Sequence, residues 1–133
     1  MTEALGGKLI LIVEDNEKNL KLARDVLQFN GFQTLEADSG EAAVGIAREH
    51  LPDLILMDIE LPGIDGITAL QQLRADSQTA GIPIVALTAS AMSADRDRFV
   101  GAGFDGYISK PINIKEFPGQ VRAHCERATL EPS

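Results

Sequence analysis

Five side chains with complementary chemistry follow short apolar segments of this 133-residue sequence. They comprise three carboxylates, one hydroxyl and one ammonium group, carried by Glu14, Asp15, Asp58, Thr88 and Lys110. Three carboxylates in one cleft repel one another, so a site that keeps them all ionised needs a cation. Oxygen ligands with space for bound waters are typical of Mg²⁺. The sequence therefore predicts an acidic Mg²⁺ site wherever the fold brings these residues together.

The same side chains suit the transfer of a phosphoryl group. Mg²⁺ and the ammonium of Lys110 would together neutralise the charge of an incoming phosphoryl group. The carboxylate of Asp58 is then the candidate nucleophile, and its in-line attack on phosphorus would give an aspartyl phosphate. Thr88 would donate a hydrogen bond to a phosphoryl oxygen, which offers a way for the modification to be read.

Five apolar runs predict the strands that position these residues. Short runs rich in Ile, Leu and Val indicate buried strands, here at residues 8–13, 32–37, 53–58, 82–87 and 106–109. The segments between them have helical periodicity; the first carries a predicted core stripe of Leu22, Ala23, Val26 and Leu27. This alternation predicts an α/β fold with a parallel sheet. Ligands bind such sheets at the carboxyl ends of the strands.

Local signals predict where the helices begin and end. Asn30–Gly31 would stop the first helix, and Asp38 followed by Glu41 forms a capping-box-like start for the second. Asp95 and Asp97 would lie in the first turn of a fourth helix. The last helix either starts with a tight turn near residue 113 or opens at about residue 117, because a Pro-Gly pair follows.

Length and composition exclude several classes of function. A chain of 133 residues fits one domain, which we place at 8–127 between terminal segments 1–7 and 128–133. The net charge of −8 disfavours nucleic-acid binding. One cysteine, Cys125, permits no internal disulfide, and no apolar stretch approaches the roughly 20 residues of a membrane span. We expect a cytoplasmic protein and, at Cys125, a semi-buried or surface thiol that is not a nucleophile.

The sequence resembles the receiver domain of two-component response regulators. The motifs that carry the resemblance occur in order over residues 8 to 125: Glu14–Asp15, Leu54–Asp58 continuing to Pro62 and Gly66, Thr88–Ala89, Tyr107, and Lys110–Pro111. The resemblance implies a flavodoxin-like (CheY-like) fold, with five parallel strands in the order 2-1-3-4-5 and five helices. It also implies that the chain is not an enzyme beyond phosphoryl transfer and dephosphorylation on its own aspartate.

The resemblance assigns roles to individual residues. Asp58 would be the phosphoacceptor, and Asp15, Asp58 and the backbone carbonyl of Glu60 would bind Mg²⁺, with Glu14 acting through bound water. Lys110 would contact the phosphoryl oxygens, and its bond to Pro111 would be cis. Thr88 and Tyr107 would form the switch pair. The side chain of Glu60, beside the phosphoryl site, is expected to affect the lifetime of the aspartyl phosphate.

The resemblance also implies the partners. A histidine kinase or a histidine phosphotransfer protein would supply the phosphoryl group, and a downstream protein would bind the face of helix 4, strand 5 and helix 5. Two groups of receivers look similar: stand-alone, DivK-like regulators, which the length favours, and receivers of hybrid histidine kinases. A Mg²⁺-dependent aspartyl-nucleophile phosphohydrolase is a remote alternative. The oligomeric state is left open between a monomer and a weak dimer.

One face of the first helix is a candidate docking surface for the phosphoryl donor. Asn16, Asn19 and Leu20 recur at helical spacing beside the predicted phosphorylation site. An ordinary solvated helix face with one apolar residue is an equally good interpretation of this pattern.

Overall fold

The computed structural model describes residues 8–59, 61, 63–89 and 101–130. The strands are β1 (Leu9–Val13), β2 (Gln33–Ala37), β3 (Leu54–Asp58), β4 (Ile84–Thr88) and β5 (Gly106–Ser109). The helices within these ranges are α1 (Glu17–Phe29), α2 (Gly40–His50), α3 (Gly66–Ala75) and α5 (Phe117–Leu130). The predicted first turn of a fourth helix, with Asp95 and Asp97, lies outside the described residues.

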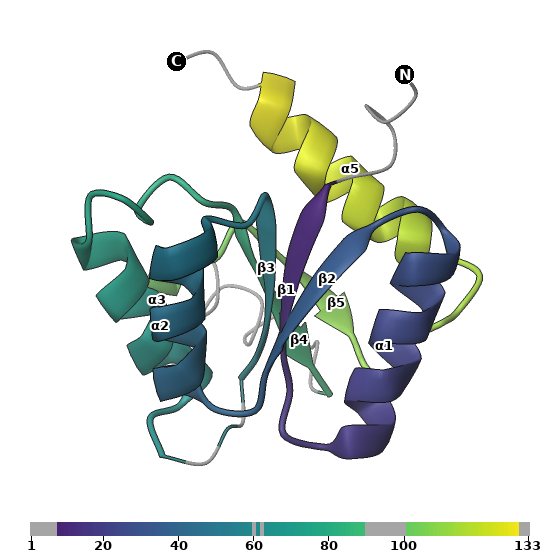
Figure 1. Cartoon of the computed structure of the whole chain (residues 1–133), viewed down its shortest axis with the longest axis horizontal. Coiled ribbons are helices and arrows are strands. Elements are labelled where there is room, and N and C mark those ends of the chain that lie inside the picture. Colours follow the sequence, from purple (N-terminus) through teal and green to yellow (C-terminus); the bar gives the residue numbers. More distant parts are fainter. Residues whose placement is uncertain (1–7, 60, 62, 90–100, 131–133) are drawn as a thin grey trace.

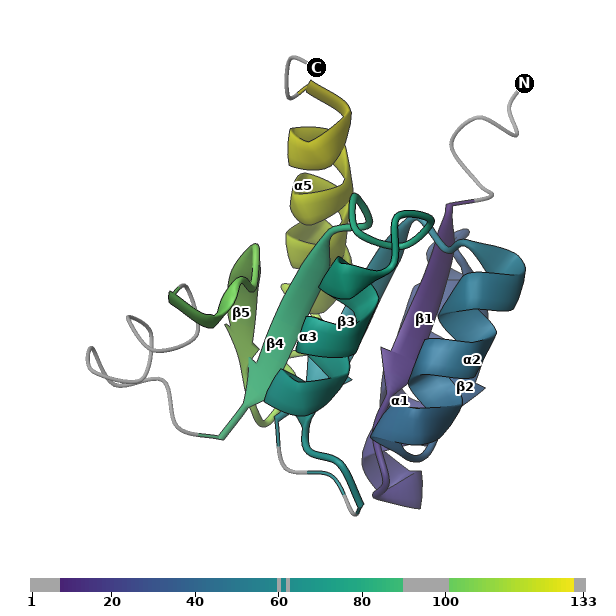
Figure 2. The same ribbon diagram turned by 90° about the vertical axis from the view of Figure 1, so that its left-hand side faces the viewer.

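The strands form one parallel sheet in the order β2-β1-β3-β4-β5. The predicted α/β class and strand order are therefore confirmed. Helices α2 and α3 cover one face of the sheet, while α1 and α5 cover the other (Figure 1). All carboxyl ends of the strands point to the lower edge in that view, and Figure 2 shows β5 at the margin of the sheet beyond β4. No helix in the described ranges combines the length and apolar character that crossing a membrane requires.

The central strands are apolar on both faces because helices cover both. Every residue of β3 and β4 is buried. Alternate residues point to opposite faces of a strand, so Ile55 and Met57 join the apolar cluster beneath α2 and α3, which we call the α2/α3 cluster. Leu54 and Leu56 join the cluster beneath α1 and α5, the α1/α5 cluster. Helices therefore pack against both faces of the strands whose carboxyl ends carry the predicted site residues.

The helix boundaries follow the predicted signals with one exception. Gly31, after the C-cap residue of α1, has φ of +92°, the left-handed conformation that glycine tolerates best. The predicted capping role of Asp38 is wrong. The next residue, Ser39, caps α2, since its side chain accepts a hydrogen bond of 3.1 Å from the backbone N–H of Ala42. Both interpretations of the last helix hold in part, because residues 114–116 form a turn and α5 begins at Phe117.

The predicted core stripe of α1 is wrong at Leu22. Ala23 and Leu27 are buried, and Val26 packs partly against the α1/α5 cluster, but Leu22 is 39% exposed. Leu20 packs against that cluster in its place. Leu20, Ala23 and Leu27 have the i, i+3, i+7 spacing of a single helix face, which shows that the inward face is rotated from the predicted one.

Candidate functional site

Four of the predicted site residues meet at the carboxyl edge of the sheet. Glu14 directly follows β1, Asp58 ends β3, Thr88 ends β4 and Lys110 directly follows β5. Glu14, Asp58 and Thr88 are 2%, 4% and 5% exposed, although each is polar. Buried polar groups are costly unless they are paired, so their presence together at one edge indicates a functional site.

An acidic cluster is formed by Glu14, Asp15 and Asp58. Each offers one carboxylate oxygen, and these three oxygens lie within 4.8 Å of one another. Asp15 is exposed while the other two are buried, so the cluster opens to solvent on one side. A set of oxygen donors that is partly open to water fits a hydrated divalent cation such as Mg²⁺.

Lys110 places its ammonium group between the two buried carboxylates. Its Nζ lies 2.9 Å from Oε1 of Glu14 and 2.9 Å from Oδ2 of Asp58. The backbone supports this position, because the N–H of Lys110 donates a hydrogen bond of 2.8 Å to the carbonyl oxygen of Thr88. The peptide bond from Lys110 to Pro111 is cis, the geometry that the resemblance implies.

Burial and pairing shift the pKa values of the groups in this site. Burial raises the pKa of the Glu14 carboxyl above its usual value; the hydrogen bond from Lys110 opposes that shift, and the neighbouring Asp58 adds to it. For Lys110, burial alone would lower the pKa, but the hydrogen bonds to Asp58 and Glu14 outweigh it and the pKa is raised. Lys110 is therefore a cation at neutral pH and balances part of the negative charge.

The loop after β3 follows Asp58 and ends at Gly66, the first residue of α3. The N–H of Gly66 donates a hydrogen bond of 3.1 Å to the carbonyl oxygen of Ile59. A Cβ atom at residue 66 would lie 2.5 Å from the carbonyl oxygen of Asp58, closer than any side chain tolerates. Glycine is thus required for this close approach. Glu60 and Pro62 lie outside the described residues.

Thr88 and Tyr107 lie on the same face of the sheet. Tyr107 is paired with Ala86, and Ala86 precedes Thr88 by two residues on β4, so all three point to one side. That side is the one covered by the α2/α3 cluster, against which Tyr107 packs while remaining partly exposed. This arrangement brings the two predicted switch residues to neighbouring positions of adjacent strands.

The predicted docking face of α1 needs one correction. Asn16 caps α1, with its Oδ1 accepting a hydrogen bond of 3.0 Å from the N–H of Asn19. Leu20, which was predicted to face a partner, is partly buried and packs against the α1/α5 cluster, so little of its side chain is left for docking. Leu22, two residues further along α1, is 39% exposed. It lines an open groove together with Asn19, Ala89, Lys110, Pro111 and Ile112.

Sequence reasoning missed this groove because its two walls are far apart along the chain. One wall comes from α1 and the other from the segment after β5. The groove runs from the exposed face of α1 to Lys110, so the candidate docking surface adjoins the acidic cluster. We refer to Asn19, Leu22 and Ile112 below as the α1 groove.

Comparison with known proteins agrees with this fold. The family model described as the response regulator receiver domain matches residues 10–122. The chain belongs to the family of response regulator receiver domains. It is 44% identical over 117 residues to the polar-differentiation response regulator DivK of Brucella ovis, a match covering 88% of this chain and 95% of that protein.

Two solved structures illustrate the likeness. The receiver domain of a sensor histidine kinase from Pseudomonas aeruginosa, solved with a magnesium ion coordinated in its active-site cleft, is 34% identical with a TM-score of 0.83, covering 91% of this chain and 99% of that one. A Francisella response regulator receiver domain is 27% identical with a TM-score of 0.82, covering 90% of this chain and 98% of that one. The chain is thus a receiver domain of the two-component type.

Proposed function

We propose that Asp58 accepts the phosphoryl group in this receiver. The observation that carries the proposal is the position of its carboxylate, at the end of β3, within 2.9 Å of the Lys110 ammonium and beside Glu14 and Asp15. An oxygen of Asp58 forms a bond to phosphorus while the bond from phosphorus to a donor histidine nitrogen breaks. The imidazole leaves with that electron pair and takes up a proton from solvent, which leaves an aspartyl phosphate on this chain.

The neighbouring groups stabilise the charge that this transfer brings. Lys110 neutralises phosphoryl oxygens once Asp58 is modified, and Thr88 donates a hydrogen bond to one of them. Asp15 and Asp58 would hold Mg²⁺, with Glu14 acting through metal-bound water. The resemblance adds the backbone carbonyl of Glu60, which lies outside the described residues, as a further ligand. When bound, Mg²⁺ supplies positive charge to the phosphoryl oxygens. The magnesium ion in the Pseudomonas receiver domain supports this assignment.

The modification is read through Thr88 and Tyr107. Movement of Thr88 toward the phosphoryl group leaves space on the face of the sheet that it shares with Tyr107, and Tyr107 turns inward into that space. The surface around β5 and α5 changes as a result and binds a downstream protein. The shared face of the two side chains supports this coupling.

The phosphoryl donor is a histidine kinase or a histidine phosphotransfer protein that docks on the α1 groove. Because that groove adjoins Lys110, a donor helix lying in it would bring its phosphohistidine to Asp58. The identity of 44% to DivK, over 95% of the length of that protein, supports a DivK-like regulator that signals by protein contacts.

Transfer from a phosphorylated donor tests this function. A phosphotransfer protein loaded on its histidine should lose its phosphoryl group to the wild-type chain and keep it in the presence of Asp58→Asn. Retention of the group with both acceptors would contradict the proposal for that donor. Transfer to both would mean that another residue is the acceptor.

A further inference from the structure

The guanidinium group of Arg74, near the end of α3, joins two separate segments at the edge of the sheet opposite to the acidic cluster. Its Nη1 donates hydrogen bonds to the carbonyl oxygens of Ala80 (2.9 Å) and Ile82 (2.6 Å). Its Nη2 donates to the carbonyl oxygen of Gly103 (3.1 Å) and to Oδ2 of Asp105 (2.7 Å). One side chain thus holds the connection that leads into β4 and the segment that leads into β5.

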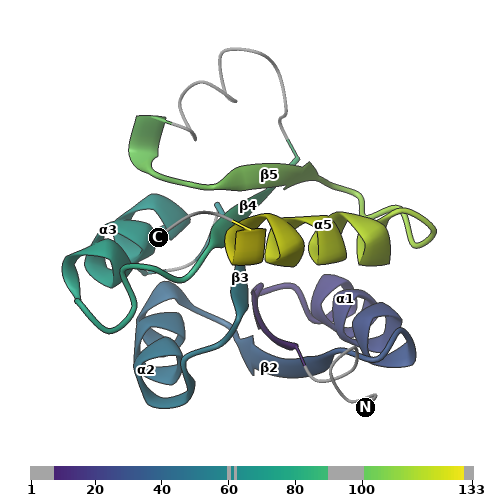
Figure 3. The same ribbon diagram turned by 90° about the horizontal axis from the view of Figure 1, so that it is seen from above.

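Asp105, directly before β5, extends this network to Ile84, the first residue of β4. Its Oδ2 also accepts a hydrogen bond of 2.8 Å from the N–H of Ile84, and its own N–H donates one of 2.8 Å to the carbonyl oxygen of Ile84. The regular pairing of the strands starts one residue later, at Val85 and Gly106. We call Arg74 and Asp105 the amino-end clamp of β5. Figure 3 shows the segment before β5 beside α3.

The geometry of the clamp requires arginine. Four of its five N–H donors are directed in one plane at fixed acceptors, which the single ammonium of lysine cannot reproduce. Gly103 has φ of +113°, a left-handed conformation, at the residue whose carbonyl oxygen Arg74 binds. Asp105 is about half exposed, at 48%, so charge alone adds little stability to this pair. The clamp therefore acts chiefly by fixing positions.

β5 is the strand that links the clamp to the phosphorylation site. It is an edge strand, paired only with β4 among the described strands, and it spans Gly106–Ser109. The clamp lies at its amino end, Tyr107 lies in the strand, and Lys110 follows its carboxyl end. A strand held at one end responds to a displacement at the other by reorienting the residues between them.

We propose that Arg74 is a positioning residue of the switch. The amino-end clamp keeps the start of β5 in place, so that changes at Thr88 and Lys110 reorient Tyr107 instead of shifting the whole strand. This inference rests on the proposed function, because it takes the phosphorylation of Asp58 as the event that is transmitted. Without the clamp, Asp58 is still phosphorylated but Tyr107 no longer follows its state.

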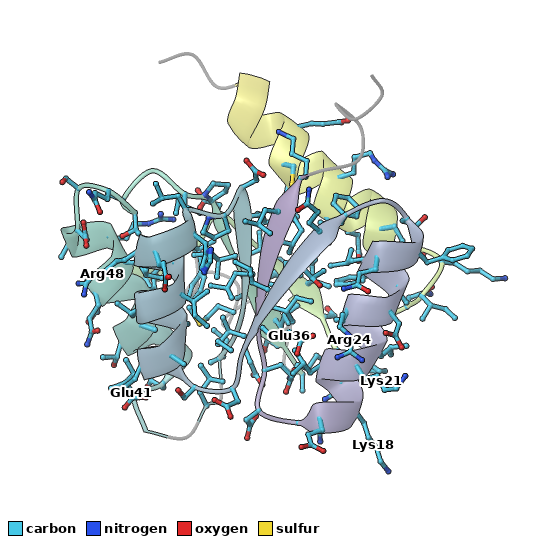
Figure 4. The ribbon with its side chains drawn as sticks, in the orientation of Figure 1. Lys18, Lys21, Arg24, Glu36, Glu41 and Arg48 are labelled. Carbon is cyan, nitrogen blue, oxygen red and sulfur yellow. The ribbon has the colours of Figure 1, made fainter. Side chains whose placement is uncertain are left out.

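Tyrosine fluorescence tests this directly, because the chain contains one tyrosine and no tryptophan. Arg74→Lys and Asp105→Asn keep polar side chains and are preferred to alanine variants. Arg48→Lys is the matched control: Arg48, labelled in Figure 4, pairs with Asp76 at 2.7 Å, joining α2 to the end of α3 without contacting β5. Each protein is treated with Mg²⁺ and a small phosphodonor. The extent of the adduct is read by intact mass and Tyr107 emission is recorded before and after.

The expected result distinguishes phosphorylation of Asp58 from the response of Tyr107 to it. Both clamp variants should form the adduct within about twofold of the wild-type rate, while the phosphorylation-dependent change in emission falls below half of the wild-type change. Arg48→Lys should match the wild type in both. A full emission change in Arg74→Lys and Asp105→Asn would contradict the positioning role of Arg74, while the proposed phosphorylation of Asp58 would stand. Absence of an adduct on the wild type would contradict the proposed function, and with it the proposed response of Tyr107 to phosphorylation.

Discussion

Lys110 donates a hydrogen bond of 2.9 Å to Asp58 across 52 residues of sequence. The same ammonium lies 2.9 Å from Glu14, so one cation is shared by two buried carboxylates from different strands. The contact requires β1, β3 and β5 to end at one edge of the sheet. If Asp58 accepts a phosphoryl group as proposed, a positive charge already lies against it before that anionic group arrives.

Removing this cation should destabilise the fold. Lys110→Gln leaves the carboxylates of Glu14 and Asp58 close together without a compensating charge. The expected loss is at most about 3 kcal/mol of unfolding free energy, because the cluster opens to solvent at Asp15. Urea unfolding without divalent cations measures it. The double variant Lys110→Gln/Asp58→Asn should recover part of the loss, whereas strictly additive effects would show that the two groups are not coupled.

Mg²⁺ should stabilise the wild-type chain through the acidic cluster. At a concentration about 100 times its dissociation constant, a ligand of the folded state adds about 2.7 kcal/mol. Asp15→Asn should abolish most of the Mg²⁺-dependent rise in Tm while leaving the Tm without Mg²⁺ unchanged, since Asp15 is exposed. Glu17→Gln, an exposed carboxylate in the first turn of α1, is the control and should respond as the wild type does. An equal response of Asp15→Asn would place the metal elsewhere.

Replacing glycine by alanine should have opposite effects on stability at Gly66, which ends the loop after β3, and at Gly45 in α2. Gly66→Ala would bring a Cβ to 2.5 Å from the carbonyl oxygen of Asp58, so the loop must move. We expect a loss of about 1–3 kcal/mol and slower phosphorylation of Asp58, by roughly tenfold or more. Gly45→Ala, in the exposed part of α2 with open space around its Cβ, should stabilise the protein by about 0.5–1 kcal/mol and leave phosphorylation unchanged. Equal rates in the two variants would contradict the role of Gly66.

The buried thiol of Cys125 should be unreactive. It is 4% exposed in the α1/α5 cluster, and burial raises its pKa from 9.0 to about 11. Only the thiolate reacts, so at pH 8 the native protein should be alkylated at least about 100-fold more slowly than the urea-unfolded protein. Comparable rates would show that the thiol is accessible.

The same pKa shift predicts a pH dependence with a definite sign. The raised value favours the neutral thiol in the folded state, so its contribution to stability is complete below the unfolded pKa. It should therefore be lost as pH rises from about 9 toward 11. The stability of wild type should fall relative to Cys125→Ala over that interval. A constant difference between the two proteins would contradict the shift.

The α/β class and the grouping of the site residues at one edge were predictable from local patterns in the sequence, while the strand order was implied by the resemblance to receiver domains. Short runs of Ile, Leu and Val predict strands that are covered on both faces. The carboxyl ends of parallel strands share one edge, which predicts that Asp58 and Lys110 lie on the same side of the sheet. The identity of the N-cap was harder, since Asp38 and Ser39 are both good caps and the backbone direction decides between them.

Features that depend on packing between distant segments were not predictable. The rotation of α1 that buries Leu20 and exposes Leu22 is set by its contact with the sheet and α5. Polar pairs fix α1 further: Arg24 bonds to Glu36 of β2 at 3.0 Å, and the two side chains point toward each other in Figure 4. The clamp of Arg74 likewise joins residues 31 positions apart, and nothing in the local sequence indicates it.

The corrected face of α1 predicts which substitution impairs docking. Leu22→Glu should slow transfer from a phosphohistidine donor without lowering Tm, because Leu22 is exposed and lines the α1 groove. Phosphorylation by a small donor should be unaffected, since it needs no docking surface. Leu20→Ala should instead lower stability through lost packing. Normal transfer to Leu22→Glu would exclude the groove as the docking site.

The most direct test of the account is the mass of the intact chain after incubation with Mg²⁺ and a small phosphodonor. We predict one added phosphoryl group on the wild type and none on Asp58→Asn under the same conditions. No adduct on the wild type with either the small donor or a phosphohistidine partner would contradict the central claim, and an adduct that persists in Asp58→Asn would show that the phosphorylated residue is not Asp58.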